Sequence, residues 1–196
     1  EGLVAAAAEV FQGAAWQRCA VHLMRDCMRE AGSWQLKRRV GRIVSQVFRG
    51  RDAATVTAMY HAACDMLEGC YPRAAAILEG AEPDALAYLD FPPSHWKRLR
   101  TNNVQERTNR EIKRRSRVVQ AFPSTASLVR LAGAVMREQD ETWQESRYFS
   151  EAKMRELYDE GRTRGLDGTV DWARLEAEAR KMIESGLELA DRIETA

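Results

Sequence analysis

The sequence predicts a mainly α-helical protein with at most one or two short strands. Apolar residues recur at three- and four-residue spacing through most of the chain, which is the pattern of helices with one buried face. Capping residues and proline or glycine breaks separate these stretches. Between residues 31 and 90 no segment alternates polar and apolar residues as a half-buried strand does. With 196 residues, the chain is long enough for one or two domains with a buried core.

The first half of the chain is expected to be helical apart from one short strand. A helix over residues 2–11 is ended by Gly13, and residues 15–23 form a short strand that passes into a helix reaching Glu30. The later helices of this half begin at Trp34, after the capping residue Asp52, at Pro72 and near Pro83, and the FPPS sequence at 91–94 interrupts the series.

The second half is expected to contain longer helices. The first runs from about Asn103 to Arg117, and Phe122–Pro123 separates it from a second, capped by Ser124 or Thr125. The second helix carries Leu128, Leu131, Ala132, Val135, Met136 and Trp143 on one face. Residues 150–160 are predicted to be helical, 161–169 to form a flexible turn, and Asp171 to cap a final amphipathic helix.

Composition places the chain among globular proteins that do not span a membrane. No apolar run approaches the roughly 18 residues that a membrane-spanning helix needs. The four cysteines form no CxxC pair, so reduced thiols and a cytoplasmic location are expected. The chain opens at Glu1, directly on helix-forming residues and without a methionine, and we expect it to be a piece of a longer polypeptide.

Positive charge is concentrated in residues 95–119. This segment has nine Lys or Arg residues against two glutamates, a net charge of +7, whereas the whole chain carries only +1. Residues 51–94 and 138–196 are acidic, with net charges of −5 and −7. A basic segment in a near-neutral chain is typical of a surface that contacts nucleic acid, because phosphates attract Lys and Arg and release counterions on binding. The lack of paired side chains suited to base edges favours contacts with phosphate.

Glu106 lies within this basic segment. On a helix it shares one stripe with Arg110, Lys113 and Arg117, at spacings of four, seven and eleven residues. One interpretation is that Glu106 binds Mg²⁺ beside a phosphate while the cations hold the nucleic-acid backbone. Two structural interpretations stay open: a capping box formed by Asn103 and Glu106, and a simple ion pair between Glu106 and Arg110.

Cys19 and His22 form a C-x-x-H sequence. A thiolate and an imidazole at this spacing are able to bind zinc, but no second ligand pair follows at the spacing of a zinc finger. The simpler interpretation is structural, with the cysteine buried and the histidine hydrogen-bonded at a strand–helix corner. Trp34 and Trp96 are expected in the core, although an exposed tryptophan is able to stack on an unpaired base.

The sequence from His95 to Val135, HWKRLRTNNVQERTNREIKRRSRVVQAFPSTASLVRLAGAV, resembles the C-terminal signature of bacterial insertion-sequence transposases of the Mutator family. Three further stretches are similar to that family: EGL followed by WQRCAVH near the start, the FP break before Trp96, and RYFSEAKM at 147–154. The resemblance covers about residues 1–157 and is densest over 95–135.

The resemblance implies a DDE-type transposase with an RNase H-like catalytic core, in which two Asp and one Glu bind Mg²⁺ for DNA cleavage and strand transfer. Glu106 matches the catalytic Glu, and Cys19 and His22 match the family's C-x-x-H motif. The DNA-binding residues are then expected to be Arg107, Arg110, Lys113, Arg114 and Arg117, with insertion-element ends and target DNA as partners. The intact protein is expected to be a homo-oligomer.

Four segments follow from this resemblance. Residues 1–30 end an RNase H-like segment, 31–94 form an all-α insertion, 95–157 carry the catalytic-Glu helix and the closing helices of the core, and 158–196 form a divergent helical tail.

The chain departs from the family pattern in ways that affect activity. Both catalytic Asp are expected upstream of the EGL at which the chain begins, and Asp26, Asp52, Asp65 and Asp90 do not match their positions. Gln120 replaces the usual Gly. We therefore expect this chain alone neither to cleave nor to join DNA. Two rival interpretations remain: a catalytically dead remnant that still binds DNA, and a helical domain whose basic helix docks on an acidic protein.

Overall fold

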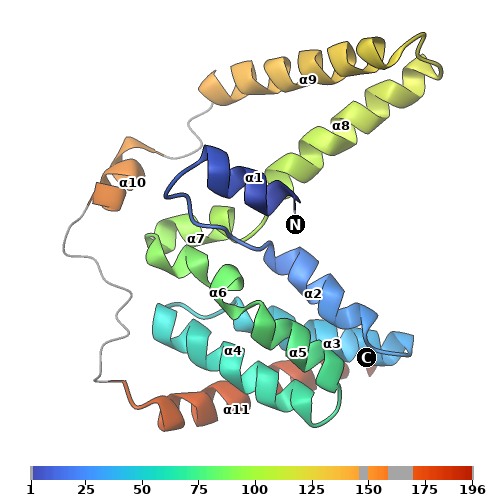
Figure 1. The fold of residues 1–196 in the computed structure, drawn as a ribbon. Coiled ribbons are helices and arrows are strands. Elements are labelled where there is room, and N and C mark those ends of the chain that lie inside the picture. The colour runs from blue at the N-terminus through green and yellow to red at the C-terminus, as the bar shows by residue number, and fades with distance from the viewer. Residues whose placement is uncertain (1, 146–149, 159–169, 196) are drawn as a thin grey trace. The chain divides into compact units, whose positions relative to one another are not determined.

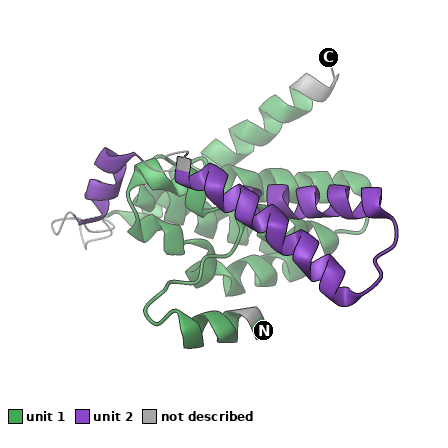
Figure 2. Ribbon diagram, turned by 90° about the horizontal axis from the view of Figure 1, so that it is seen from above, with its two compact units in different colours: residues 1–101, 160–196 green, residues 102–159 purple. Residues whose placement is uncertain are grey.

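The computed structural model of the protein describes residues 2–145, 150–158 and 170–195. These residues form helices, turns and irregular segments, with no strand among them, so the mainly α prediction is confirmed. The chain divides into two compact units (Figure 2): residues 1–101 with 160–196 form unit 1, and residues 102–159 form unit 2. Among the described helices, none combines the length and the apolar character that crossing a membrane requires.

Unit 1 is a helical bundle built around α4 (Figure 1). Its described elements are α1 (Gly2–Val10), α2 (Ala20–Arg29), α3 (Trp34–Val47), α4 (Ala53–Glu68), α5 (Pro72–Gly80), α6 (Glu82–Ala85), η1 (Ala87–Asp90), α7 (Pro93–Leu99) and α11 (Trp172–Thr195). Helix α4 packs against α3, α5 and α11, and α2 packs against α3 and α5. Val44 of α3, Leu67 of α4 and Leu78 of α5 are fully buried where these helices meet.

The caps predicted for α4, α5 and α11 are present. The Asp52 carboxylate accepts a hydrogen bond from the Thr55 backbone N–H at 2.8 Å, and Pro72 occupies the first turn of α5. The Asp171 carboxylate likewise accepts from the Arg174 backbone N–H at 3.1 Å. Local sequence therefore sets where these helices begin.

The short strand predicted over residues 15–23 is wrong. Helix α2 already begins at Ala20, and the residues before it are irregular. Their polar groups bond to loops and helix ends: the Arg18 N–H donates to the Asp84 carbonyl at 2.8 Å, and the Ala20 N–H to the Arg100 carbonyl at 2.9 Å. The Gln17 side chain accepts from the Tyr88 N–H at 2.6 Å. The segment is extended but has no neighbouring strand to pair with in the described chain, so no ladder forms.

The two tryptophans expected in the core differ. Trp96 is buried and donates its indole N–H to the Phe91 carbonyl at 2.7 Å, as the prediction requires. Trp34 is 67% exposed at the start of α3, so its assignment to the core was wrong. It is the first residue of the helix, where neighbouring elements cover less of the surface.

Helix α11 completes the bundle although more than a hundred residues separate it from α4. Its predicted apolar face is real: Ala179 and Ile183 are buried, and Leu175 packs against the same core. The helix contacts α4 and α3. Residues 159–169, which include the predicted turn at 161–169, lie outside the described residues.

His61 of α4 joins this last helix to the bundle. Its Nδ1 lies 2.9 Å from a carboxylate oxygen of Glu176 on α11, and its Nε2 lies 3.0 Å from one of Glu82 on α6. Because a carboxylate only accepts hydrogen bonds, satisfying both contacts requires both ring nitrogens to carry protons, as in the imidazolium. Burial lowers the pKa of His61, but the hydrogen bonds to Glu176 and Glu82 outweigh burial and raise it.

Unit 2 is dominated by a helical hairpin. Helices α8 (Asn103–Val119) and α9 (Thr125–Glu145) pack along each other, and α10 (Glu151–Arg155) and η2 (Glu156–Tyr158) follow. The Ser124 hydroxyl accepts from the Ser127 N–H at 3.2 Å, as expected for a residue that caps α9. Thr108 of α8 and Val135 of α9 are the buried side chains of the pair.

The turn after α8 is strained at Gln120. This residue has φ 62° and ψ −58°, and the Ala121 N–H donates to the Val119 carbonyl at 2.8 Å. That is a γ-turn with positive φ, a conformation that side chains with a Cβ adopt at a cost of about 1–3 kcal/mol. Glycine adopts this conformation without that cost.

Replacing His61 is expected to remove a pH-dependent part of the stability of unit 1. A raised pKa in the folded state means that the imidazolium stabilises the fold below about pH 6.5, the unfolded value, and that this contribution is lost as pH rises through the folded pKa. The free energy of unfolding of the wild type should therefore fall more steeply than that of His61→Gln between about pH 6 and pH 8. Urea titrations measure both, with His22→Gln, at an exposed position of α2, as the matched control. Parallel pH profiles for wild type and His61→Gln would contradict a stabilising role of the His61 contacts with Glu176 and Glu82.

Gln120→Gly is expected to stabilise unit 2. Relief of the positive-φ strain should raise its free energy of unfolding by about 1 kcal/mol, net of the greater backbone entropy of glycine in the unfolded chain. The same substitution at Gln105, exposed within α8, should instead destabilise by about 1 kcal/mol. Denaturant unfolding followed by circular dichroism measures both. A Gln120→Gly variant less stable than the wild type would show that the turn is not strained.

Candidate nucleic-acid interface

Helix α8 holds most of the basic segment. It begins at Asn103, and Asn102 precedes it without a side-chain capping bond. Asn103 is therefore inside the first turn and does not form the N-cap of a capping box, which removes one of the structural interpretations of Glu106. The Glu106 N–H is satisfied by the Asn102 carbonyl at 3.0 Å, as a normal bond of the first turn.

One side of α8 is held against α9. Thr108 is buried and returns a hydrogen bond to the Val104 carbonyl at 3.2 Å, and Ile112 is half-buried one turn later. Arg115 lies on the same side and reaches across, with Nη1 2.7 Å from a Glu138 oxygen on α9. The packed side therefore carries its own ion pair, which ties the two helices of the hairpin together.

Glu111 is the counter-ion of two arginines on α8. Its oxygens accept from Arg114 at 2.7 and 2.9 Å and from Arg115 Nε at 2.8 Å. These hydrogen bonds lower the pKa of the Glu111 carboxyl to about 2, so it is ionised at neutral pH. Because the group is exposed, water screens the pairs and we assign them no stability. Their effect is to neutralise part of the positive charge of the helix.

The remaining cations share one exposed side. At 100° per residue, Glu106, Arg110, Lys113 and Arg117 fall within about 60° of one another around the helix, and Arg107 and Arg114 flank them. We call these six residues the α8 polar face. Its five cations are exposed, and Glu106 is half-buried. This face lies opposite the side that packs on α9.

Four cations of the α8 polar face have no ion pair with any described residue: Arg107, Arg110, Lys113 and Arg117. Arg114, which lies beside them on the helix, forms an ion pair with Glu111. The structure therefore brings all five predicted DNA-binding residues to one side of α8 and distinguishes one of them as partly neutralised. Unpaired guanidinium and ammonium groups are the ones free to exchange water and counterions for phosphate.

The part of the chain that is described does not assemble a complete metal site. Glu106 offers a carboxylate, the ligand type that Mg²⁺ prefers. The other carboxylate on α8, Glu111, is occupied by two arginines. No group of three or more potential Cys, His, Asp or Glu ligands occurs among the described residues. The residues present thus fit one ligand of a Mg²⁺ ion and not the whole coordination shell.

The C-x-x-H residues lie at the start of α2. Cys19 is half-buried directly before the helix, and His22 is exposed in its first turn. The Cys19 carbonyl accepts from the Leu23 N–H at 2.9 Å, and the neighbouring backbone is anchored through Arg18 and Ala20. The backbone of the segment is therefore anchored, but Cys19 is only half-buried and no strand precedes α2, so the strand–helix corner of the structural interpretation is absent. The roles of the two side chains remain a prediction.

Sequence reasoning missed the ion pair between Arg115 and Glu138. The spacing of Glu111 and Arg115 on one helix signals a local pair, but Glu138 lies on the next helix and no sequence periodicity connects it to Arg115. The same applies to His61, whose two carboxylate partners come from α6 and α11.

Comparison with known proteins places the chain in a family. The family model described as "Transposase, Mutator family" matches residues 1–146, which leaves α11 outside the match. The chain is 39% identical over 150 residues to a transposase for insertion sequence element IS1081 from Mycobacterium tuberculosis, with 76% of this chain and 35% of that protein covered.

Two further relatives give the same result. A transposase for IS406 from Burkholderia multivorans is 33% identical over 76% of this chain and 38% of its own length. A transposase for IS256 in transposon Tn4001 from Staphylococcus aureus is 31% identical over 73% of this chain and 37% of its own length. The chain thus spans somewhat over a third of these relatives, and no solved structure matches it. The chain belongs to the Mutator family of transposases.

Proposed function

We propose that the chain is part of a DDE-type transposase that moves an insertion element by cutting DNA and transferring strands. In this proposal it supplies the catalytic Glu106 and a helix, α8, that holds the DNA backbone. The RNase H-like core to which α8 would belong, action in the cytoplasm and homo-oligomeric assembly are parts of the same proposal. Family membership supports the reaction class, since the relatives are named as transposases of insertion sequence elements.

The observation that carries the proposal is the composition of the α8 polar face. Four unpaired cations follow one half-buried carboxylate along the same exposed side of the helix. Cations by themselves are able to bind any polyanion. A carboxylate among them lowers the affinity for nucleic acid because it repels phosphate. A carboxylate at this place is useful when it binds a metal ion beside the phosphate that reacts.

The residues of this chain would have separate tasks. Arg107, Arg110, Lys113 and Arg117 hold phosphates through charge-assisted hydrogen bonds, and they orient the strand along α8. Glu106 contributes one oxygen ligand to Mg²⁺, which when bound activates water or a DNA 3′-hydroxyl and stabilises charge at phosphorus. The remaining ligands are expected from two Asp outside this chain. Arg115 and Glu138 keep α8 fixed on α9.

A DNA-binding remnant without chemistry is the alternative. The neutralised pair of Glu111 and Arg114 shows that only part of the helix is available, yet the four unpaired cations suffice for phosphate contacts. Docking on an acidic protein would use the same cations. These three possibilities differ in their response to salt and to loss of Glu106.

Neutralising the α8 polar face is expected to weaken DNA binding and its dependence on salt. A variant with Arg107, Arg110, Lys113 and Arg117 changed to Gln should lower the slope of log affinity against log salt by about 0.9 for each phosphate that is no longer bound. Fluorescence anisotropy with labelled duplex DNA across a salt series measures this. The matched control changes four exposed cations outside α8 to Gln, namely Arg49, Arg51, Arg73 and Lys181. Equal slopes for both variants would overturn the DNA role of α8.

Glu106 is expected to be needed for chemistry and not for binding. Residues 95–119 can be placed in the complete IS1081 transposase in exchange for its own segment, and Glu106→Gln made in this chimera. Strand cleavage with Mg²⁺ should fall at least about a hundredfold while DNA affinity is retained or rises. Glu111→Gln, which removes the other carboxylate of the same helix, is the matched control and should keep most of the cleavage. Full cleavage by the Glu106→Gln chimera would favour the binding-only alternative.

A further inference from the structure

A groove between α2 and α3 in unit 1 belongs to no part of the function proposed above. It has a volume of about 460 Å³ and is lined by His22, Arg25, Asp26, Met28, Arg29 and Lys37. The two helices approach closely here, since a Cβ built on Gly41 of α3 would meet the Met28 sulfur of α2 at 2.8 Å. The two helices are therefore closely packed beneath the groove, and most of its lining side chains are charged. We call it the α2–α3 groove.

The positive charge of the α2–α3 groove is only partly neutralised. Asp26 is its one carboxylate, and it pairs with Arg29 and, at 3.0 Å, with Arg18. Although burial opposes it, these pairs lower the pKa of Asp26, so the group is ionised and already paired. Arg25 and Lys37 have no ion pair with a described residue. Two cations therefore remain for a ligand.

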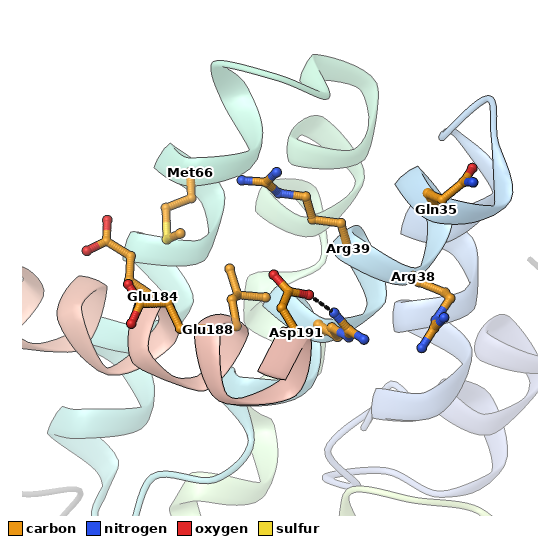
Figure 3. Close-up of a pocket in the computed structure, with 9 residues that line it drawn as sticks. Gln35, Arg38, Arg39, Met66, Glu184, Glu188 and Asp191 are labelled. Carbon is orange, nitrogen blue, oxygen red and sulfur yellow. Dashed lines mark hydrogen bonds and ion pairs between the residues drawn. The ribbon is translucent and has the colours of Figure 1, made fainter. Parts of the chain in front are cut away.

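On the opposite side of α3, arginines and carboxylates occur together in equal numbers. A pocket of about 510 Å³ lies there between α3 and α11 (Figure 3), lined by Arg38, Arg39 and Arg42 of α3 and by Glu184, Glu188 and Asp191 of α11. Arg42 and Asp191 pair at 2.5 Å. The lining of that pocket thus contains three arginines and three carboxylates. The α2–α3 groove has only Asp26 as a lining carboxylate, so its other cations are available to an external anion.

Trp34 precedes the part of α3 that lines the groove, and it is not itself a lining residue. It is 67% exposed, which is unusual for the largest apolar side chain, and it lies one turn before Lys37 on the same side of α3. Helical geometry places Trp34, Lys37 and Gly41 within about 60° of one another, on the side that approaches α2. An exposed indole beside cations is suited to stack on a base whose phosphates the cations hold.

We propose that the α2–α3 groove is a second DNA contact site, specific for a strand with an unpaired base. Arg25 and Lys37 hold the phosphates, and the unpaired base stacks on Trp34. The choice of DNA as the polyanion rests on the proposed function, while the groove itself is independent of α8. A transposase acts on DNA whose ends are cut, and unpaired bases occur at such ends.

The test measures the affinity of the full chain for two DNA probes: a blunt duplex and the same duplex with a single-stranded thymidine tail. Trp34→Ala is expected to lower affinity for the tailed probe at least about fivefold and to leave the blunt duplex unchanged. Trp34→Phe, which keeps an aromatic ring, should restore most of the loss. Because Trp34 is exposed, these changes should leave the fold intact, and circular dichroism checks this.

The cations are tested in the same assay. Arg25→Gln with Lys37→Gln should make the salt slope for the tailed probe shallower by about 0.7 for each phosphate of the single strand that is no longer bound. Arg49→Gln with Arg73→Gln removes equal charge from exposed positions outside the groove and should leave the slope unchanged. The inference is overturned if Trp34→Ala affects both probes equally or neither, or if the control pair matches the groove pair.

The outcomes for the groove and for α8 are separable. If the α8 variant binds both probes as the wild type does while the groove variants lose the tailed probe, the DNA role of α8 fails and the groove inference stands. If only the α8 variant loses affinity, the groove inference fails and the proposed function stands.

Discussion

The packing around α4 is the constraint on which unit 1 depends. Three helices bury their apolar faces on it, and alanines along α4, such as Ala58 and Ala62, let their backbones approach closely. The Tyr60 hydroxyl donates to the Leu78 carbonyl at 2.5 Å, which satisfies a buried polar group where α5 crosses. Removing any one of α3, α5 or α11 would expose part of this core, so the bundle needs a helix from the far C-terminal part of the chain.

Charge is distributed by pairing within the fold as much as by sequence. Arginines occur along α2, α3 and α8, but Asp26, Glu111 and Asp191 each neutralise some of them. Two groups of cations that have no ion pair with a described residue lie on the α8 polar face and in the α2–α3 groove. The net charge of residues 95–119 overstates the number of cations available on the α8 polar face. For the α2–α3 groove, net charge does not distinguish the unpaired cations from the paired arginines beside them. An ion pair removes a cation from the count available to phosphate.

The α8–α9 hairpin explains how a highly charged helix is kept in place. Of the described side chains of α8 and α9, only Thr108 and Val135 are buried, so apolar packing is limited. The contact from Arg115 to Glu138 adds a connection across the hairpin, and exposed pairs of this kind contribute little stability but do restrict orientation. In the proposed transposase this orientation decides where Glu106 and the cations of the α8 polar face point. The strained turn at Gln120, by contrast, weakens the hairpin at its end.

The sequence by itself determined the helical class, most helix boundaries, the family and the grouping of cations on one side of α8. These depend on local information: caps such as Asp52, breaks such as Pro72, and the 3.6-residue period, all of which act within a few residues. Only the tertiary structure decided that residues 15–19 form no strand, that Trp34 is exposed, that α11 closes the core, and that His61 and Arg115 bridge separate helices. Those outcomes depend on which distant elements meet. The spacing of residues along one helix does not identify the helix that packs against it.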